Sequence, residues 1–102
     1  MATSWSLNNV KVYNTLNGNS DVIYLVNYNV IASDDNGNVF TLSKEESIDT
    51  SNITNFVSFA NLTESIVMGW VKTELGTDAV SDINQEAEDA LSDFLNTSVK
   101  TL

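Results

Sequence analysis

Residues 59–76 constrain the fold more than any other stretch, because they combine a helix start signal, an apolar stripe and a stop signal. Asn61 is placed to cap the first turn, and Glu64 can return a hydrogen bond to the cap as in a capping box. Gly76 follows where a left-handed C-terminal cap would lie. The spacing predicts an amphipathic helix over about 62–75 that lays a tryptophan-bearing face on another element. Its stripe consists of Leu62, Ile66, Val67, Trp70 and Val71.

The residues before this helix alternate as strands do. The longest strand candidate is 21–32, where β-branched and tyrosine side chains disfavour a helix. Two further strands are predicted over about 4–13 and 38–43, and a fourth over 55–59 is left open. One face of the longest strand carries Val22, Tyr24, Val26, Tyr28 and Val30.

Turn signals join these strands. Asn17-Gly18 is the dipeptide that best tolerates the two positive φ angles of a type I′ turn, so it predicts a hairpin tip. Residues 34–38 supply a second turn, and its residue types favour a tight turn over a calcium loop. The alternation slips at Asn8-Asn9, which predicts a β-bulge. Strands joined by short turns form an antiparallel meander.

A second amphipathic helix is predicted over about 78–96, and residues 44–55 are predicted to be a polar loop. The whole of 1–102 then forms one α+β domain, a meander of three to four strands packed against two C-terminal helices. The predicted core consists of Trp5, Val26, Phe40, Phe59, Leu62, Ile66, Trp70, Val80, Ile83, Leu91 and Phe94.

Charge and composition exclude several function classes. Four lysines, no arginine and fourteen acidic residues give a net charge of −10, so nucleic-acid backbones and anionic membranes would repel the chain. With no Cys and no His, it lacks thiol nucleophiles, the commonest general base and the usual zinc ligands. We expect no enzyme, no cofactor, no metal and no small-molecule substrate, and the carboxylates are expected to form solvated faces and turns.

A three-stranded sheet with helices on one face leaves its other face open, and an open apolar face tends to meet a partner. Aromatic residues on the strands and one isoleucine of the 44–55 loop are therefore the candidate contacts. They are Tyr13, Tyr24, Tyr28 and Ile48.

The chain resembles a known family in its opening Ser4-Trp5, its alternating middle and the motif L-T-E-x-x-V-x-G-W-V over 62–71. This is a family of small, mostly uncharacterised proteins encoded by tailed bacteriophages of marine bacteria, and the resemblance covers residues 4 to about 90. It implies a phage protein with a role in the virion. The chain departs from the family pattern over 92–102, which continues as a helix where a tail with Pro and Trp is expected.

The expected function is that of a phage virion structural protein acting by protein–protein binding. A capsid decoration or cement protein is favoured, with other head- or tail-associated roles included, so the partners are capsid or tail proteins and a homo-oligomer is left open. The alternative is a non-virion accessory protein that binds a host protein, with its acidic charge mimicking nucleic acid. Residues 1–7 lack the basic and apolar regions of a secretion signal, so the expected location is the virion, after synthesis in the host cytoplasm.

Overall fold

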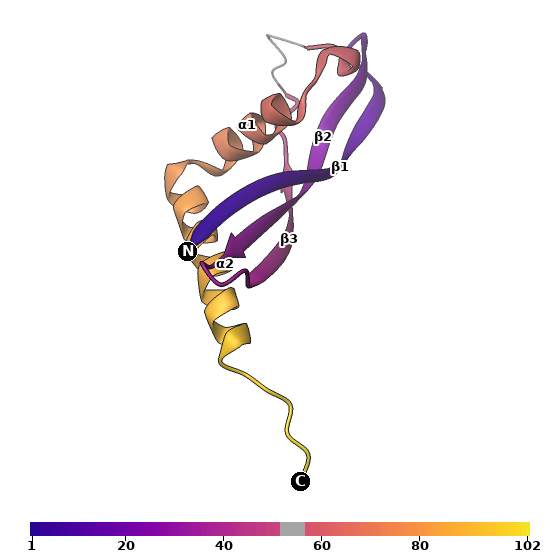
Figure 1. The fold of residues 1–102 in the computed structure, drawn as a ribbon. Coiled ribbons are helices and arrows are strands. Elements are labelled where there is room, and N and C mark those ends of the chain that lie inside the picture. The colour runs from indigo at the N-terminus through magenta and orange to yellow at the C-terminus, as the bar shows by residue number, and fades with distance from the viewer. Residues whose placement is uncertain (52–56) are drawn as a thin grey trace.

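The computed structural model describes residues 1–51 and 57–102 and confirms the α+β fold. Three antiparallel strands form one sheet in the order β1-β2-β3, and two helices lie together on one of its faces (Figure 1). The molecule is elongated, with extents of 61 × 29 × 21 Å. The elements are β1 (Ala2–Leu16), β2 (Asn19–Ser33), β3 (Val39–Ser47), the short 3-10 helix η1 (Phe59–Asn61), α1 (Glu64–Leu75) and α2 (Thr77–Leu95).

The turn between β1 and β2 is the predicted one. Asn17 and Gly18 have φ angles of 51° and 83°, and Leu16 pairs with Asn19 across them. Two positive φ angles in a two-residue loop match the right-handed twist of the flanking strands. The register of the first hairpin is therefore fixed at its tip.

Two irregularities interrupt the β1–β2 pairing. The first lies between Leu7 and Asn9, where the predicted bulge is confirmed. The second was not predicted: Lys11 pairs with Leu25 and Val12 with Ile23, so Tyr24 is the extra residue of β2. Because one extra residue exchanges the two faces of a strand, Ile23 joins the core and Tyr24 does not.

The core lies between β2 and the two helices. β2 contributes half of the buried cluster, because it is the central strand and is flanked by β1 and β3. The buried cluster consists of Ile23, Val26, Tyr28, Val30 and Ala32 from β2, Val67, Met68 and Val71 from α1, and Ala87 and Leu91 from α2.

Helix α1 begins later than predicted, and its cap is different. Thr63 is the N-cap, and its Oγ1 accepts a hydrogen bond from the Ile66 N–H at 3.3 Å. Asn61 belongs to η1 instead. Glu64 makes no capping box, because its Oε1 accepts the backbone N–H of Leu7 at 2.9 Å. This contact ties α1 to β1 and occupies a donor on an edge strand, where open donors invite pairing with other chains.

The third strand is longer than predicted, so part of the predicted 44–55 loop is wrong. Residues 44–47 continue β3, where Lys44 pairs with Tyr28 and Glu46 with Val26. The Lys44 Nζ lies 2.8 Å from a Glu86 carboxylate oxygen on α2, which gives a polar residue a partner on the helix side of the sheet. The proposed fourth strand over 55–59 lies in part outside the described residues, and its described part, 57–59, forms no strand.

Trp5 connects all the layers of the molecule. Its ring stacks on Tyr28 of β2 with centroids 5.3 Å apart and planes 5° from parallel. Its Nε1 donates to Asn84 Oδ1 of α2 at 2.7 Å, and the Lys72 Nζ of α1 lies 5.2 Å from the ring centroid. Stacking, a hydrogen bond and a cation–π contact therefore meet at one side chain from β1.

We predict that Trp5→Phe lowers the free energy of unfolding by about 1–2 kcal/mol. The phenyl ring can still stack on Tyr28, but it has no N–H to donate to the half-buried Asn84 oxygen. Urea denaturation measures this. Asn84→Ala should cost a similar amount, and the double variant should cost less than the sum of the two singles, since both changes remove one bond. Additive losses would contradict this account.

A single residue, Gly76, joins the two helices. Its N–H donates to Lys72 O at 3.0 Å and its carbonyl accepts from Val80 N at 3.1 Å, so it ends α1 and begins α2. Its φ of 85° lies in the left-handed region that favours glycine. Gly69, by contrast, lies inside α1, and no atom from elsewhere in the described chain lies within 4 Å of where its Cβ would stand.

These two glycines predict opposite effects of alanine. Gly69→Ala should raise the free energy of unfolding by about 0.5–1 kcal/mol, because alanine is the better helix former and has room there. Gly76→Ala should lower it by about 1 kcal/mol or more, because alanine must adopt a positive φ. Thermal and urea unfolding of the two variants report the signs of the two changes directly, and equal signs would contradict the different backbone conformations of Gly69 and Gly76.

Candidate functional site

Most of the predicted core residues lie where they were expected. Val26 and Leu91 are fully buried, and five others are half-buried against the core cluster. These five are Trp5, Phe40, Leu62, Trp70 and Ile83. Val80 is also half-buried, near the start of α2.

Three predicted core residues are exposed, which corrects the prediction for each. Phe59 lies in η1 rather than in a fourth strand of the sheet, and 46% of its surface is exposed. Ile66 is exposed because the inward face of α1 is centred on Val67 and Val71. Phe94 is 58% exposed because it lies at the end of α2, where the sheet covers one side of its ring only.

The four residues predicted to contact a partner differ in how exposed they are in the structure. Tyr28 is 1% exposed and stacked on Trp5, so its assignment as a contact was wrong. Burial raises the pKa of its hydroxyl, and Glu46 and Glu86 raise it further. Ile48 is half-buried against the core, and its N–H donates to Tyr24 O at 2.9 Å. Tyr13 and Tyr24 stack on each other at 4.4 Å, and Tyr13 stays exposed.

The sheet face opposite the helices is polar, which corrects the expectation of an open apolar face. Asn8 and Asn29 exchange two amide hydrogen bonds at 2.8 Å, and Asn27 Nδ2 donates to Asn9 Oδ1 at 2.6 Å. Ser43 Oγ of β3 also donates to Asn29 Oδ1, so the bonds span all three strands. Amides that satisfy one another fix the strand register and leave little apolar surface for a partner.

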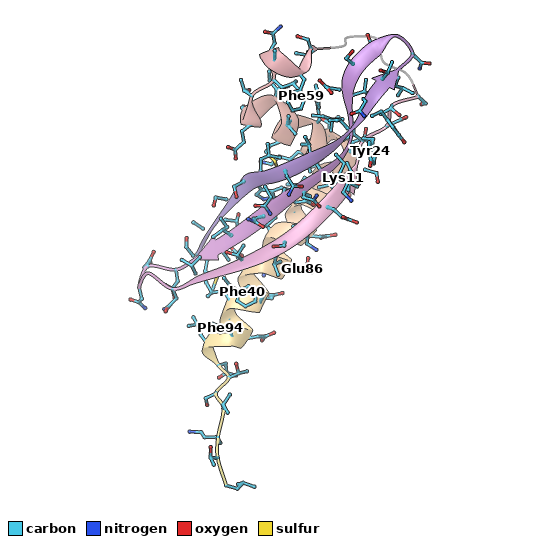
Figure 2. The ribbon with its side chains drawn as sticks, turned by 90° about the vertical axis from the view of Figure 1, so that its right-hand side faces the viewer. Lys11, Tyr24, Phe40, Phe59, Glu86 and Phe94 are labelled. Atoms are coloured by element: carbon cyan, nitrogen blue, oxygen red, sulfur yellow. The ribbon has the colours of Figure 1, made fainter. Side chains whose placement is uncertain are left out.

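One group of apolar side chains with exposed members lies at the end of α2. Phe40 of β3 and Phe94 of α2 meet there with ring centroids 5.7 Å apart, and Leu95 follows with 47% of its surface exposed. Figure 2 shows Phe40 and Phe94 together near the end of α2, far from Phe59 and Tyr24. We call Phe40, Phe94 and Leu95 the apolar end. Exposed aromatic and leucine side chains side by side are typical of a protein-binding surface.

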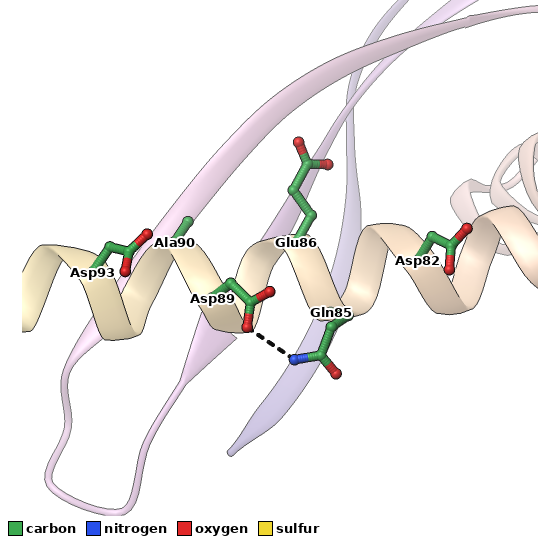
Figure 3. Close-up of a pocket in the computed structure, with 6 residues that line it drawn as sticks. All are labelled: Asp82, Gln85, Glu86, Asp89, Ala90 and Asp93. Carbon is green, nitrogen blue, oxygen red and sulfur yellow. Dashed lines mark hydrogen bonds between the residues drawn. The ribbon is translucent and has the colours of Figure 1, made fainter.

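The helix that leads to the apolar end is acidic. Within α2 there is no lysine, and the last turn has no basic residue to offset the helix dipole. Figure 3 shows a shallow hollow along one side of α2 in which Asp89 accepts a hydrogen bond from Gln85 at 2.9 Å. The hollow is lined by Asp82, Gln85, Glu86, Asp89, Ala90 and Asp93. The apolar end is therefore bordered by negative charge.

The turn between β2 and β3 holds the strand that carries Phe40. Asp34 Oδ1 accepts the N–H groups of Asn36 and Asn38 at 2.9 Å, and its Oδ2 accepts the Asn38 side-chain amide at 2.9 Å. Gly37 completes the turn with a φ of 82°. The tight turn predicted for 34–38 is confirmed. The hydrogen bonds from the Asn38 side chain and backbone hold the pKa of the Asp34 carboxyl below its usual range.

A pH dependence follows from this turn. A carboxyl with a lowered folded-state pKa stabilises the fold at neutral pH, and the contribution is lost as the pH falls through the lowered value. We predict that NMR titration of the Asp34 carboxyl gives a pKa below the ordinary value of about 3.9. The backbone amide chemical shifts of Asn36 and Asn38 should change with the same midpoint. In the Asp34→Asn variant this pH dependence should disappear. A midpoint at or above the ordinary value would contradict the hydrogen-bonded turn.

Sequence reasoning assigned Phe94 to the core and did not identify it as exposed. The stripe gives the inward side of a helix, whereas exposure depends on how far the sheet reaches beneath it. The turn signal at 34–38 marks the end of the sheet. The spacing of apolar residues within α2, however, does not determine the angle at which α2 crosses the strands. The end of α2 projects past the sheet in both views (Figures 1 and 2).

Two other kinds of site are absent from the part of the chain that the structure describes. Among residues 1–51 and 57–102, no three His, Cys, Asp or Glu side chains are grouped so that they could hold a metal ion. No described helix is long and apolar enough to cross a membrane.

Comparison with known proteins finds one family whose sequence profile matches the chain, over residues 1–101, described as a domain of unknown function, DUF7936. No curated protein and no solved structure matches. The matched range includes both Trp5 and the apolar end. The chain thus belongs to the DUF7936 family.

Proposed function

We propose that this protein is a structural component of a bacteriophage particle that binds another virion protein through its apolar end. The role is that of a capsid decoration or cement protein, or of another head- or tail-associated protein. The observation that carries the proposal is the exposure of Phe94 and Leu95, side by side, at the end of a helix with an acidic side. The resemblance of the 62–71 motif to that of phage-encoded proteins supports the proposal that the protein comes from a phage.

Binding through this end is consistent with the rest of the surface. The open sheet face is occupied by paired asparagines, and Glu64 holds the Leu7 N–H at the β1 edge. Aromatic side chains dominate the energy of protein interfaces because they bury much surface with little loss of side-chain freedom. Phe94 has this character and already rests on Phe40, so it is partly ordered before a partner arrives.

The proposal is tested on particles purified from a phage that encodes the chain. Mass spectrometry should detect the wild-type protein in many copies per particle, because decoration proteins bind a repeated shell. Phe94→Ser should strongly reduce the copy number while the free energy of unfolding changes by about 1 kcal/mol or less, since the ring is mostly exposed.

Phe59→Ser is the matched control, because Phe59 is also an exposed phenylalanine but lies at the other end of the molecule (Figure 2). This variant should retain wild-type copy number. Absence of the wild-type chain from particles, although it is abundant in infected cells, would refute the virion role. Equal retention of both variants would refute the apolar end as the contact.

A second candidate function has one observation in its favour, the acidic side of α2 shown in Figure 3. In this alternative the chain is a non-virion accessory protein that binds a nucleic-acid-binding host protein by mimicking phosphate charge. The ion pair between Glu86 and Lys44 weakens it, because one acid of the row is neutralised within the fold. Salt dependence separates the two functions: a mimic should lose its partner steeply as salt rises, whereas an apolar contact should not.

A further inference from the structure

Helix α2 ends where its packing support ends. Near its end, Phe94 contacts Phe40 of β3, and the backbone leaves the helix at Asn96. Residues 97–102 then run as an extended tail away from the body (Figure 1). In this tail Val99 is 97% exposed and Leu102 is fully exposed. A helix turn without a packed face is marginal in water, so the structural end of α2 follows from missing support.

The sequence of the tail continues the apolar stripe of α2. Leu91, Leu95, Val99 and Leu102 are separated by four, four and three residues. At about 100° per residue, these four side chains would lie within an arc of about 80° on one continuous helix. Phe94 would border this arc on one side. A single helix through residue 102 would therefore present one unbroken apolar stripe.

We infer that residues 96–102 extend α2 by about two turns when this end docks into an apolar groove, rimmed by basic residues, on a partner protein. The inference rests on the proposed function, since it specifies the partner surface that the apolar end meets. The groove supplies the packing that the sheet supplies to the earlier turns. The rim of the groove is basic because the residues beside the stripe include the acids Asp89 and Asp93.

Charge complementarity decides the chemistry of the partner. Asp89 and Asp93 lie on the turns around Leu91, and Lys100 is the one basic residue among 96–102, so the extended helix keeps an acidic excess and an acidic groove would repel it. Cations near the end of the helix also stabilise its dipole, whether they belong to the chain or to the partner. A net charge of −10 likewise makes a second copy of this chain a poor partner for the extended helix, because the two copies would repel each other.

The spacing of the apolar residues favours a helix over an added strand. Thr97, Val99 and Thr101 are β-branched, and such residues alone would suit a strand. In a strand, however, Val99 and Leu102 would point to opposite faces, because side chains alternate with a period of two. In a helix they share a face with Leu95. A strand conformation is therefore the alternative that the test must distinguish.

The test uses the full chain, labelled with ¹⁵N and ¹³C, and a defined synthetic probe. The probe is a peptide of about three heptads with leucine at the a and d positions and lysine at e and g. One control peptide replaces the leucines by serine, and another replaces the lysines by glutamate. Backbone chemical shifts of residues 96–102 report helix, strand or coil during the titration.

The Leu/Lys peptide should bind saturably and move these shifts to helical values, and both control peptides should bind at least about tenfold more weakly. Val99→Ser combined with Leu102→Ser should weaken binding about tenfold or more, since two apolar anchors are lost. Thr97→Ser, which lies off the stripe, should leave binding unchanged.

Strand-like shifts, equal binding of the serine peptide, or no binding of the Leu/Lys peptide would each overturn the inference. Its failure can be told apart from failure of the proposed function. A chain that is abundant in particles but gives no helical shifts would retain the virion role and lose the helix extension. A chain that is absent from particles would lose the virion role whatever the peptide titration shows.

Discussion

The structure depends on the contacts of one side chain, Trp5, with the central strand and with both helices. Trp5 stands on the edge strand β1, stacks on Tyr28 of the central strand and donates to Asn84 of α2. The neighbouring Leu7 N–H is held by Glu64 of α1. An edge strand is therefore fixed to both helices by directional bonds as well as by apolar burial. Once both helices are held on this face, the opposite face is left to the paired asparagines.

This division of the surface supports the proposed contact at the end of α2. A face closed by its own amide bonds and an edge with an occupied donor offer a partner little, whereas the end of α2 projects beyond the sheet with Phe94 and Leu95 exposed. The apolar end is thus a consequence of geometry, since a helix whose end projects past the sheet must leave part of its stripe uncovered. The same consequence reaches Val99 and Leu102 in the tail.

Local signals in the sequence identified the elements well, and long-range packing explains what they missed. The Asn17-Gly18 turn, the Asp34 turn, the bulge after Leu7 and the Gly76 cap were all predictable, because each depends on the conformational preference of a few residues. The bulge at Tyr24 was not, since the strand pattern reads smoothly through it. Tyr28 was assigned to a partner because tyrosine is compatible with both a surface and a core, and only its stack on Trp5 decides. The extension of β3 through Lys44 depended on a distant acid, Glu86.

The central claim is that the apolar end, and not the sheet, carries the contact with another virion protein. A cryo-electron microscopy reconstruction of the particle with the protein in place tests it most directly. We predict that Phe94 and Leu95 are buried against a neighbouring protein while Asn27 and Asn29 face solvent. A reconstruction in which the asparagine face is buried and Phe94 projects into solvent would contradict the account.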